Sequence, residues 1–189
     1  FNWKILELTQ VGIMKAGEPV TKDVRIELRR GTHVLLAGPN GIGKSTLLGK
    51  IYSGKAEGAT IGKDVRVGYY RQDFSMLDFD KTSFDSLWEA MQEKDEQKLR
   101  STAAGFLLDG KVLATKIRNL SEGQKGLLAF THLVLMQPGL LILDEPTNHI
   151  NFRHLPIIAQ ALDSYEGALL LVSHIPDFVA KLCIDTTID

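Results

Sequence analysis

The sequence predicts an α/β domain with a mostly parallel central sheet, and two observations carry that prediction. Strand-like and helix-like segments alternate along the chain, which is typical of domains built from βαβ units. Several of the strand-like runs are apolar throughout, as expected for strands buried on both faces of a parallel sheet. The chain has 189 residues, of which 44% are hydrophobic and 24% charged. It is therefore of ordinary globular composition and can bury one sizeable core.

The individual elements follow from their residue patterns. Alternating residues at 3–11 and 24–28 predict strands, and the apolar run at 33–37 predicts a buried strand that leads into a helix at 44–52. The charged run at 92–98 is interpreted as the solvated face of a helical stretch. The other expected elements are a strand at 64–70, that helical stretch at 82–108, a helix opening at 119–124, a strand at 140–144, a helix at 153–165, a strand at 168–173, a short helix near 176–182 and a last strand near 183–188.

Charge and cysteine content narrow the class of protein. The formal net charge is −1, so no overall basic field attracts nucleic acid. Cys183 is the single cysteine; it allows no internal disulfide and fits a reducing compartment. No apolar run is long enough to span a bilayer, and the first residues lack the pattern of a signal peptide. Because the sequence also lacks an initiator Met, we expect it to be part of a longer chain.

A glycine-rich loop between the strand at 33–37 and the helix at 44–52 is the strongest functional signal. Its pattern, G-x-x-x-x-G-K-[ST], is that of a P-loop, and the strand-to-helix context is the one the motif requires. Glycines allow successive N–H groups to wrap phosphate oxygens, and the helix N-terminus adds partial positive charge. Lys44 would reach the β- and γ-phosphates, and Ser45 would offer a hydroxyl to Mg²⁺. The residues expected to bind the nucleotide are Gly38, Pro39, Asn40, Gly41, Gly43, Lys44, Ser45 and Thr46.

Two carboxylates follow the apolar run at 140–144. A parallel strand that ends in Asp144 and Glu145 brings them to its C-terminal end, where ligands bind in open α/β sheets. Asp144 is expected to hold Mg²⁺, and Glu145 to orient the attacking water or accept its proton.

The segment LSEGQK at 120–125 opens a helix about twenty residues before Asp144. Taken alone, it is a helix start in which Ser121 is the N-cap and Gln124 completes a capping box. Beside the other two motifs, Ser121, Gly123 and the helix N-terminus are interpreted as a second anion site.

In this order and at these spacings, the motifs resemble the nucleotide-binding domain of ABC ATPases, over nearly the whole chain. The resemblance implies Glu145, His174 and Gln72 as catalytic residues, and Ser45, Gln72 and Asp144 as ligands of Mg²⁺. It implies a P-loop NTPase fold, with an N-terminal antiparallel β-subdomain and a helical subdomain at about 75–137 inserted into a single domain spanning 1–189.

Three positions depart from the usual pattern of this family. Glu122 stands where the signature normally has glycine, and a carboxylate close to a partner's γ-phosphate would be repulsive unless it points away. Asn151 replaces an expected Asp, which keeps hydrogen bonding and loses the charge. No Phe, Tyr or Trp lies between Lys4 and Lys50, so Ile13 or Met14 is expected to pack on the base, with weakened base selectivity.

The string DEPTNHI resembles the ABC-F branch, whose members carry two cassettes in one chain, lack membrane domains and act mostly on ribosomes. It implies a cytoplasmic ATPase that uses ATP and Mg²⁺, pairs with a second cassette, as part of the same chain or as a homodimer, and works in translation. Two alternatives stay open. One is the ATP-binding subunit of a membrane transporter, which would carry the same catalytic motifs. The other is a catalytically weak nucleotide-sensing module.

Overall fold

The computed structural model describes residues 4–39, 41–71, 73–148, 150–180, 182, 184 and 186–188. The chain forms two compact units, each assembled from separate stretches of sequence. The first unit contains residues 1–69, 138–144 and 165–189, and the second contains residues 70–137 and 145–164.

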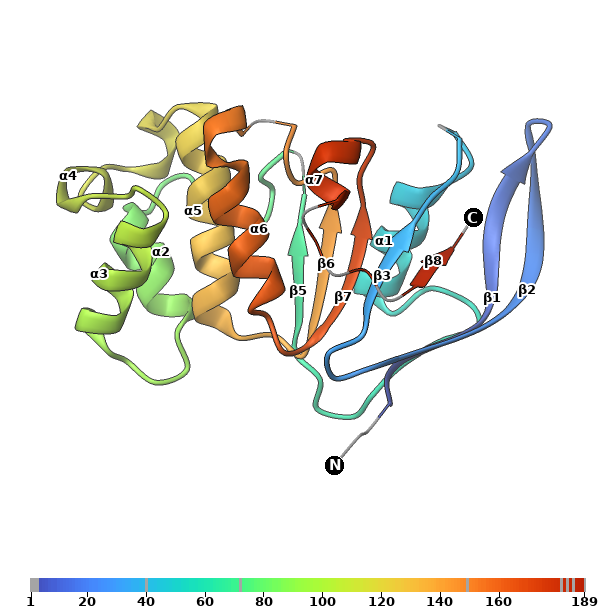
Figure 1. The fold of residues 1–189 in the computed structure, drawn as a ribbon. Coiled ribbons are helices and arrows are strands. Elements are labelled where there is room, and N and C mark those ends of the chain that lie inside the picture. Colours follow the sequence, from blue (N-terminus) through green and yellow to red (C-terminus); the bar gives the residue numbers. More distant parts are fainter. Residues whose placement is uncertain are drawn as a thin grey trace. The chain divides into compact units, whose positions relative to one another are not determined.

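An antiparallel sheet begins the first unit. β1 (Lys4–Lys15) and β2 (Glu18–Arg29) form a long ribbon, and β4 (Ala59–Ile61) pairs with the other edge of β1 (Figure 1). Both long strands extend well beyond the expected segments 3–11 and 24–28, because pairing across the ribbon supports residues that show no hydrophobic alternation. The short strand β4 was not expected from the sequence.

The larger sheet has the strand order β5-β6-β7-β3-β8, and its described pairings β6–β7, β7–β3 and β3–β8 are all parallel. The predicted mostly parallel central sheet is therefore confirmed. Every residue of β6 and β7 is buried, which explains why these runs contain no polar residue before their ends. The strands are β3 (His33–Leu36), β5 (Val67–Tyr70), β6 (Leu140–Asp144), β7 (Ala168–Val172) and β8 (Thr186–Ile188).

The core of this unit lies between the two sheets and α1 (Lys44–Ser53), which contacts both β6 and β1. Alternate residues of the parallel strands, such as Leu36 and Ile142, pack with Leu48 of the helix and Leu8 of β1 in one buried cluster. The helix begins at Lys44, as the sequence predicts. A short helix, α7 (Pro176–Ala180), follows β7.

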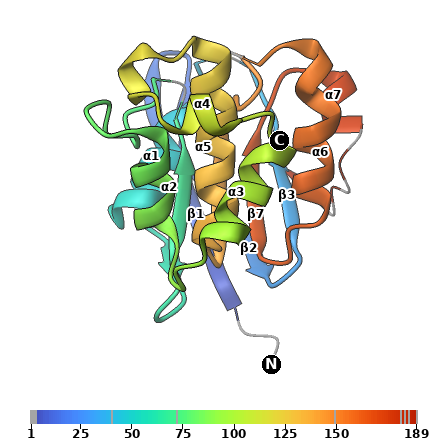
Figure 2. The same cartoon turned by 90° about the vertical axis from the view of Figure 1, so that its left-hand side faces the viewer.

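The second unit is helical, and α5 is the helix against which α2 and α3 both pack (Figure 2). Its elements are α2 (Ser83–Ala90), α3 (Glu96–Gly105), α4 (Gly110–Leu113), the 3₁₀ turn η1 (Ile117–Asn119), α5 (Glu122–Met136), the 3₁₀ turn η2 (Phe152–His154) and α6 (Leu155–Asp163). None of the described helices combines the length and the apolar character that a membrane span requires.

The helical pattern expected at 82–108 forms two helices, and the interpretation of 92–98 as a helix face was wrong for residues 92–95. Met91 is already extended, with φ −74° and ψ +132°, and ends α2. The side chain of Asp95 accepts a hydrogen bond from the Lys98 N–H at 3.0 Å and starts a new helix. Residues 92–95 are exposed, but they belong to a loop. A charged run suits a helix surface and a loop equally well, so the cap of α3 decides between them.

Candidate functional site

The glycine-rich loop joins the end of β3 to the start of α1. Gly38, Gly41 and Gly43 adopt φ angles of +134°, +85° and +101°, a region that other residues rarely occupy. Gly43 is the N-cap of α1; within the described residues no side chain caps the helix, and no acidic residue lies in its first turn. The orphan N–H groups at this helix start are therefore available to an anion. Asn40, also expected in this site, lies outside the described residues.

Lys44 lies over the same loop. Its Nζ donates hydrogen bonds to the carbonyl oxygens of Gly38 and, at 3.4 Å, of Pro39. Ser45 and Thr46 are exposed at the first turn of the helix. An ammonium group, two hydroxyls and uncapped N–H groups thus converge at one helix end.

The strand register brings two further expected residues to the same edge of the sheet. Leu36, the last residue of β3, pairs with Val172 of β7, and Val172 pairs with Asp144 of β6. Because all three strands are parallel, the P-loop, Asp144 and His174 follow neighbouring strand ends. His174 is exposed, two residues beyond the end of β7.

Asp144 is 7% exposed, and its Oδ1 atom has no hydrogen-bond partner among the described residues. A buried carboxylate oxygen without a donor is costly unless a cation or another ligand compensates it. Groups of three or more metal-binding side chains are absent from the described part of the chain. Mg²⁺ commonly uses only one or two protein ligands together with phosphates and water, so Asp144 and Ser45 fit such an ion.

Glu145 is the first residue of the second unit after β6. It is 9% exposed and adopts φ +47°, an uncommon conformation for a residue with a side chain. Strained backbone of this kind is often associated with function. Nothing in the sequence around Glu145 predicts this conformation. Gln72, the third expected catalytic residue, lies outside the described residues.

The signature segment is also in the second unit, at the start of α5. The Gln124 N–H donates to Ser121 Oγ at 3.1 Å, and the Ser121 N–H donates to Gln124 Oε1 at 3.0 Å. The capping box expected from the sequence is therefore confirmed. Glu122 is exposed and Gly123 half-buried in the first turn of α5. Asn151 accepts a hydrogen bond from the Arg153 N–H at 3.0 Å and caps η2.

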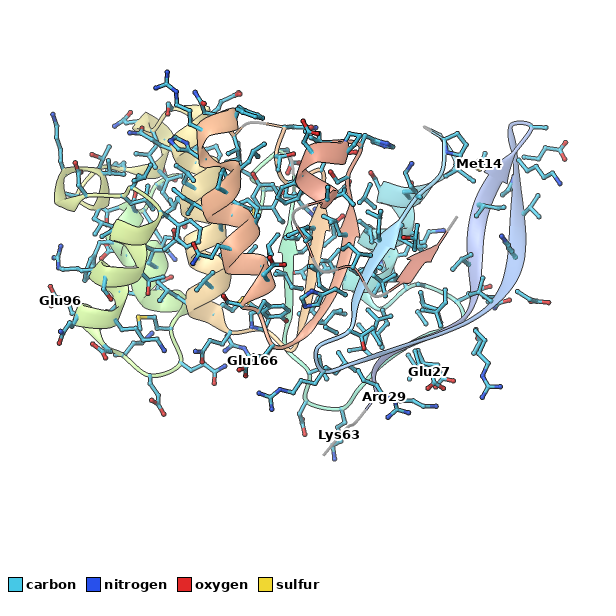
Figure 3. All side chains as sticks on the ribbon, viewed as in Figure 1. Met14, Glu27, Arg29, Lys63, Glu96 and Glu166 are labelled. Carbon is cyan, nitrogen blue, oxygen red and sulfur yellow. The ribbon has the colours of Figure 1, made fainter. Side chains whose placement is uncertain are left out.

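A pocket of about 410 Å³ adjoins the P-loop within the first unit. Ile13 and Met14 contribute to its wall; Figure 3 labels Met14. The Met14 N–H donates a backbone hydrogen bond to the Ile42 carbonyl of the P-loop at 2.9 Å. Sequence reasoning did not anticipate Val20 and Thr21, which line the pocket because β2 pairs them opposite Ile13 and Gly12. No lining residue is aromatic. The lining residues are Gln10, Gly12, Ile13, Met14, Pro19, Val20, Thr21, Ile42, Gly43, Thr46, Leu47, Lys50, Lys55, Ala56 and Glu57.

Comparison with known proteins agrees with this geometry. Residues 21–148 match the family described as ABC transporter. ATP-binding protein Uup of Escherichia coli (strain K12) is 36% identical over 183 residues, which are 93% of this chain and 29% of that protein. ATP-binding cassette sub-family F member 2 of Bos taurus is 35% identical over 166 residues, covering 85% of this chain and 26% of that protein. The chain thus spans between a quarter and a third of these two relatives.

Solved structures share the fold. The ATP-binding subunit of an ABC transporter superposes with a TM-score of 0.79 at 22% identity, covering 95% of this chain and 83% of that one. A model of ribosome-bound archaeal Pelota and ABCE1 contains a chain that matches 98% of this one with a TM-score of 0.74 at 18% identity, over 32% of its own length.

Proposed function

Because this chain belongs to the ABC transporter family, as an ABC-type P-loop ATPase domain with ABC-F members among its relatives, we propose that it binds Mg-ATP and hydrolyses it when two cassettes pair. One observation carries the proposal. The P-loop, Asp144 and His174 follow the ends of three neighbouring parallel strands that are in register. Ligands of open α/β sheets bind at such carboxyl ends.

The P-loop would hold the triphosphate. Gly38, Gly41 and Gly43 have the positive φ angles that turn backbone N–H groups toward an anion. The Lys44 ammonium now bonds to loop carbonyls, and it would exchange these for phosphate oxygens when ATP enters. Such an exchange keeps the ammonium hydrogen-bonded in both states, so binding leaves no donor unsatisfied.

Asp144 and Ser45 would hold Mg²⁺, with Gln72 as a further ligand. When bound, the ion supplies positive charge that offsets the phosphate oxygens during transfer. Glu145 would accept the proton of the attacking water, and His174 would donate a hydrogen bond to the γ-phosphate. Ile13 and Met14 would form the apolar wall on which the base packs.

We also propose that the site is completed in trans. Ser121 and Gly123 would contact the nucleotide of a second cassette, so that ATP joins two cassettes and hydrolysis releases them. The two relatives are several times longer than this chain, which leaves room for a second cassette in proteins of this kind. The finer proposal is a cytoplasmic, ABC-F-type ATPase that works on the ribosome; the string DEPTNHI and the sub-family F relative support it.

The test is the dependence of ATP turnover on protein concentration. We expect slow hydrolysis that rises steeply with chain concentration and stops when EDTA removes Mg²⁺. Constant turnover per chain in a protein that stays monomeric would contradict the paired site. Co-sedimentation of the Glu145→Gln variant with ribosomes in the presence of ATP tests the translation role, and its absence would favour the transporter alternative.

A further inference from the structure

Three segments of the second unit meet at Gly126 on α5. A Cβ atom placed on this glycine would lie 2.5 Å from Cδ1 of Ile150 and 3.3 Å from the hydroxyl oxygen of Tyr70. The first distance is far below a normal carbon–carbon contact. Gly126 does not have a positive φ, so the backbone conformation does not require glycine there. The surrounding side chains restrict it instead: Ile150 Cδ1 ends a flexible side chain and can move aside, whereas the fully buried Tyr70 ring has little room to give way.

Tyr70 forms the floor of this contact. Its side chain is fully buried, and its ring packs against Phe130 at 4.9 Å and Phe74 at 6.2 Å between centroids. Its hydroxyl has no hydrogen-bond partner among the described residues, and burial raises its pKa. The ring is therefore held by packing on several sides, while its oxygen lies against the helix at Gly126, which has no side chain.

The chain positions of these residues give the contact its meaning. Tyr70 lies two residues before Gln72, Ile150 directly precedes Asn151, and Gly126 lies one turn beyond Ser121 on the same helix. We propose that Tyr70, Gly126 and Ile150 form a steric joint that positions the signature turn of α5 relative to the end of β5 and to the segment that carries Asn151. These are positioning residues, and the inference rests on the proposed function for the consequence in ATP-driven pairing.

The steric joint also explains why a glycine occupies position 126, inside a helix. Glycine inside a helix is destabilising relative to alanine, yet Gly126 lies in the second turn of α5. Gly105, in α3 of the same unit, has no atom within 4 Å of its Cβ position. Alanine should therefore be tolerated at 105, whereas at 126 it should displace the end of the Ile150 side chain and press α5 away from the buried Tyr70 ring. The two glycines make a matched pair.

Amide hydrogen exchange tests the joint without nucleotide. The Lys125 N–H donates to the Ser121 carbonyl at 2.9 Å, and the His154 N–H donates to the Asn151 carbonyl at 2.8 Å. Gly126→Ala should raise exchange at both amides at least tenfold. Adding Ile150→Val, which removes the clashing Cδ1 atom, should restore both rates to within about twofold of wild type, and Gly105→Ala should leave them unchanged. Wild-type exchange in Gly126→Ala, or no recovery with Ile150→Val, would overturn the joint.

The same variants separate the joint from the proposed function. In a Glu145→Gln background, Gly126→Ala should weaken ATP-dependent pairing at least tenfold in light-scattering measurements. Its affinity for Mg-ATP, measured by calorimetry, should stay within twofold, because the P-loop belongs to the other unit. Ile150→Val should restore pairing. If wild type itself neither binds ATP nor pairs, the proposed function fails while the exchange result still decides the joint. Tyr70→Phe should behave as wild type; a tenfold loss would show that the hydroxyl, and not packing, is required, and would overturn the steric reading.

Discussion

Helices α1 and α5 both begin inside glycine-containing motifs, but their N-termini differ in side-chain capping. α1 starts at Gly43, where no described side chain accepts from its first N–H groups and no acidic residue occupies its first turn. α5 starts at Ser121, where a complete capping box occupies two donors and Glu122 adds a carboxylate. Both had been interpreted as anion sites from sequence. The structure makes them unequal: α1 has no side-chain cap among the described residues, whereas the capping box of α5 occupies the N–H groups of Ser121 and Gln124.

This difference in capping indicates how each unit would contact a triphosphate. An uncapped N-terminus gains hydrogen bonds when phosphate arrives, so we expect the P-loop of the first unit to bind the triphosphate without help from a partner. The cap of α5 does not exclude a second role. Ser121 Oγ accepts from Gln124, but a hydroxyl also has a hydrogen to donate. Glu122 is favourable beside its own helix N-terminus and unfavourable beside an incoming anion. We therefore expect the second unit to contact phosphate only as part of a pair.

The largest expected effect is on the rate of ATP hydrolysis. Glu145→Gln should lower ATP turnover by about 10²- to 10⁴-fold, because an amide cannot accept the proton of the attacking water. Affinity for Mg-ATP should change little. Steady-state phosphate release and calorimetry on the same preparation, at a concentration where wild type turns over, measure both. Wild-type turnover in this variant would place the base elsewhere.

Loss of the P-loop cation should have the next largest effect. Lys44→Ala leaves phosphate charge without its ammonium partner, at a cost of about 3 kcal/mol or more than a hundredfold in affinity. Lys63→Ala, an exposed lysine of the same unit (Figure 3), is the control and should bind as wild type. Calorimetric titration with Mg-ATP compares them. Equal affinity for Lys44→Ala and wild type would remove the P-loop from the binding site.

The sequence predicted those parts of the two units that depend on local pattern. The start of α1 at Lys44 follows from glycine and lysine spacing, and the capping box follows from two residues three apart. Strand β4 could not be predicted, because three residues form a strand only through their pairing with Leu6, Glu7 and Leu8. The pocket wall at Val20 and Thr21 depends on ribbon register, which is likewise non-local.

The backbone conformation at the site could not be predicted from the sequence either. The φ of +47° at Glu145 contradicts local preference for a non-glycine residue, so only the surrounding fold can impose it. The close contact at Gly126 is of the same kind, since it depends on Ile150 reaching α5 from a distant part of the chain.

An aromatic residue in place of Met14, in the pocket wall on which the base is expected to pack, should raise ATP affinity moderately. Met14 is 42% exposed and lines the pocket beside the P-loop. Met14→Tyr adds an aromatic face on which adenine can stack, a contribution of about 0.5–1.5 kcal/mol, or roughly two- to tenfold in ATP affinity. Met14→Leu is the aliphatic control. Calorimetry with ATP and GTP would also show the weak base selectivity that we expect of wild type. No gain from tyrosine would mean that the base packs elsewhere.

Removal of the carboxylate at the start of α5 should strengthen pairing by several-fold. Glu122→Gln keeps the helix-forming tendency and removes the charge, whereas Glu122→Gly also weakens the helix. Light scattering with and without Mg-ATP, in the Glu145→Gln background, measures the dimer fraction. Both variants should pair better than the parent, and Glu122→Gln should be the more stable of the two. Unchanged pairing in both would show that Glu122 points away from the partner's phosphate.

A comparison of Ser121 with a second helix cap separates the two roles of Ser121. Ser121→Ala removes the acceptor of the Gln124 N–H and should lower the free energy of unfolding by about 1 kcal/mol. Thr82→Ala is a matched control, because Thr82 caps α2 in the same unit through the Asp85 N–H at 3.1 Å, and its loss should cost a similar amount. If Ser121 only caps its helix, the two variants will pair with ATP equally well in the Glu145→Gln background. If its hydroxyl hydrogen also reaches a partner's phosphate, Ser121→Ala will lose a further five- to tenfold in pairing, the worth of about one hydrogen bond. Thermal unfolding and light scattering on the two variants distinguish these results. Equal pairing would leave α5 an ordinary capped helix, and the open N-terminus of α1 would then be the only one of the two that binds phosphate.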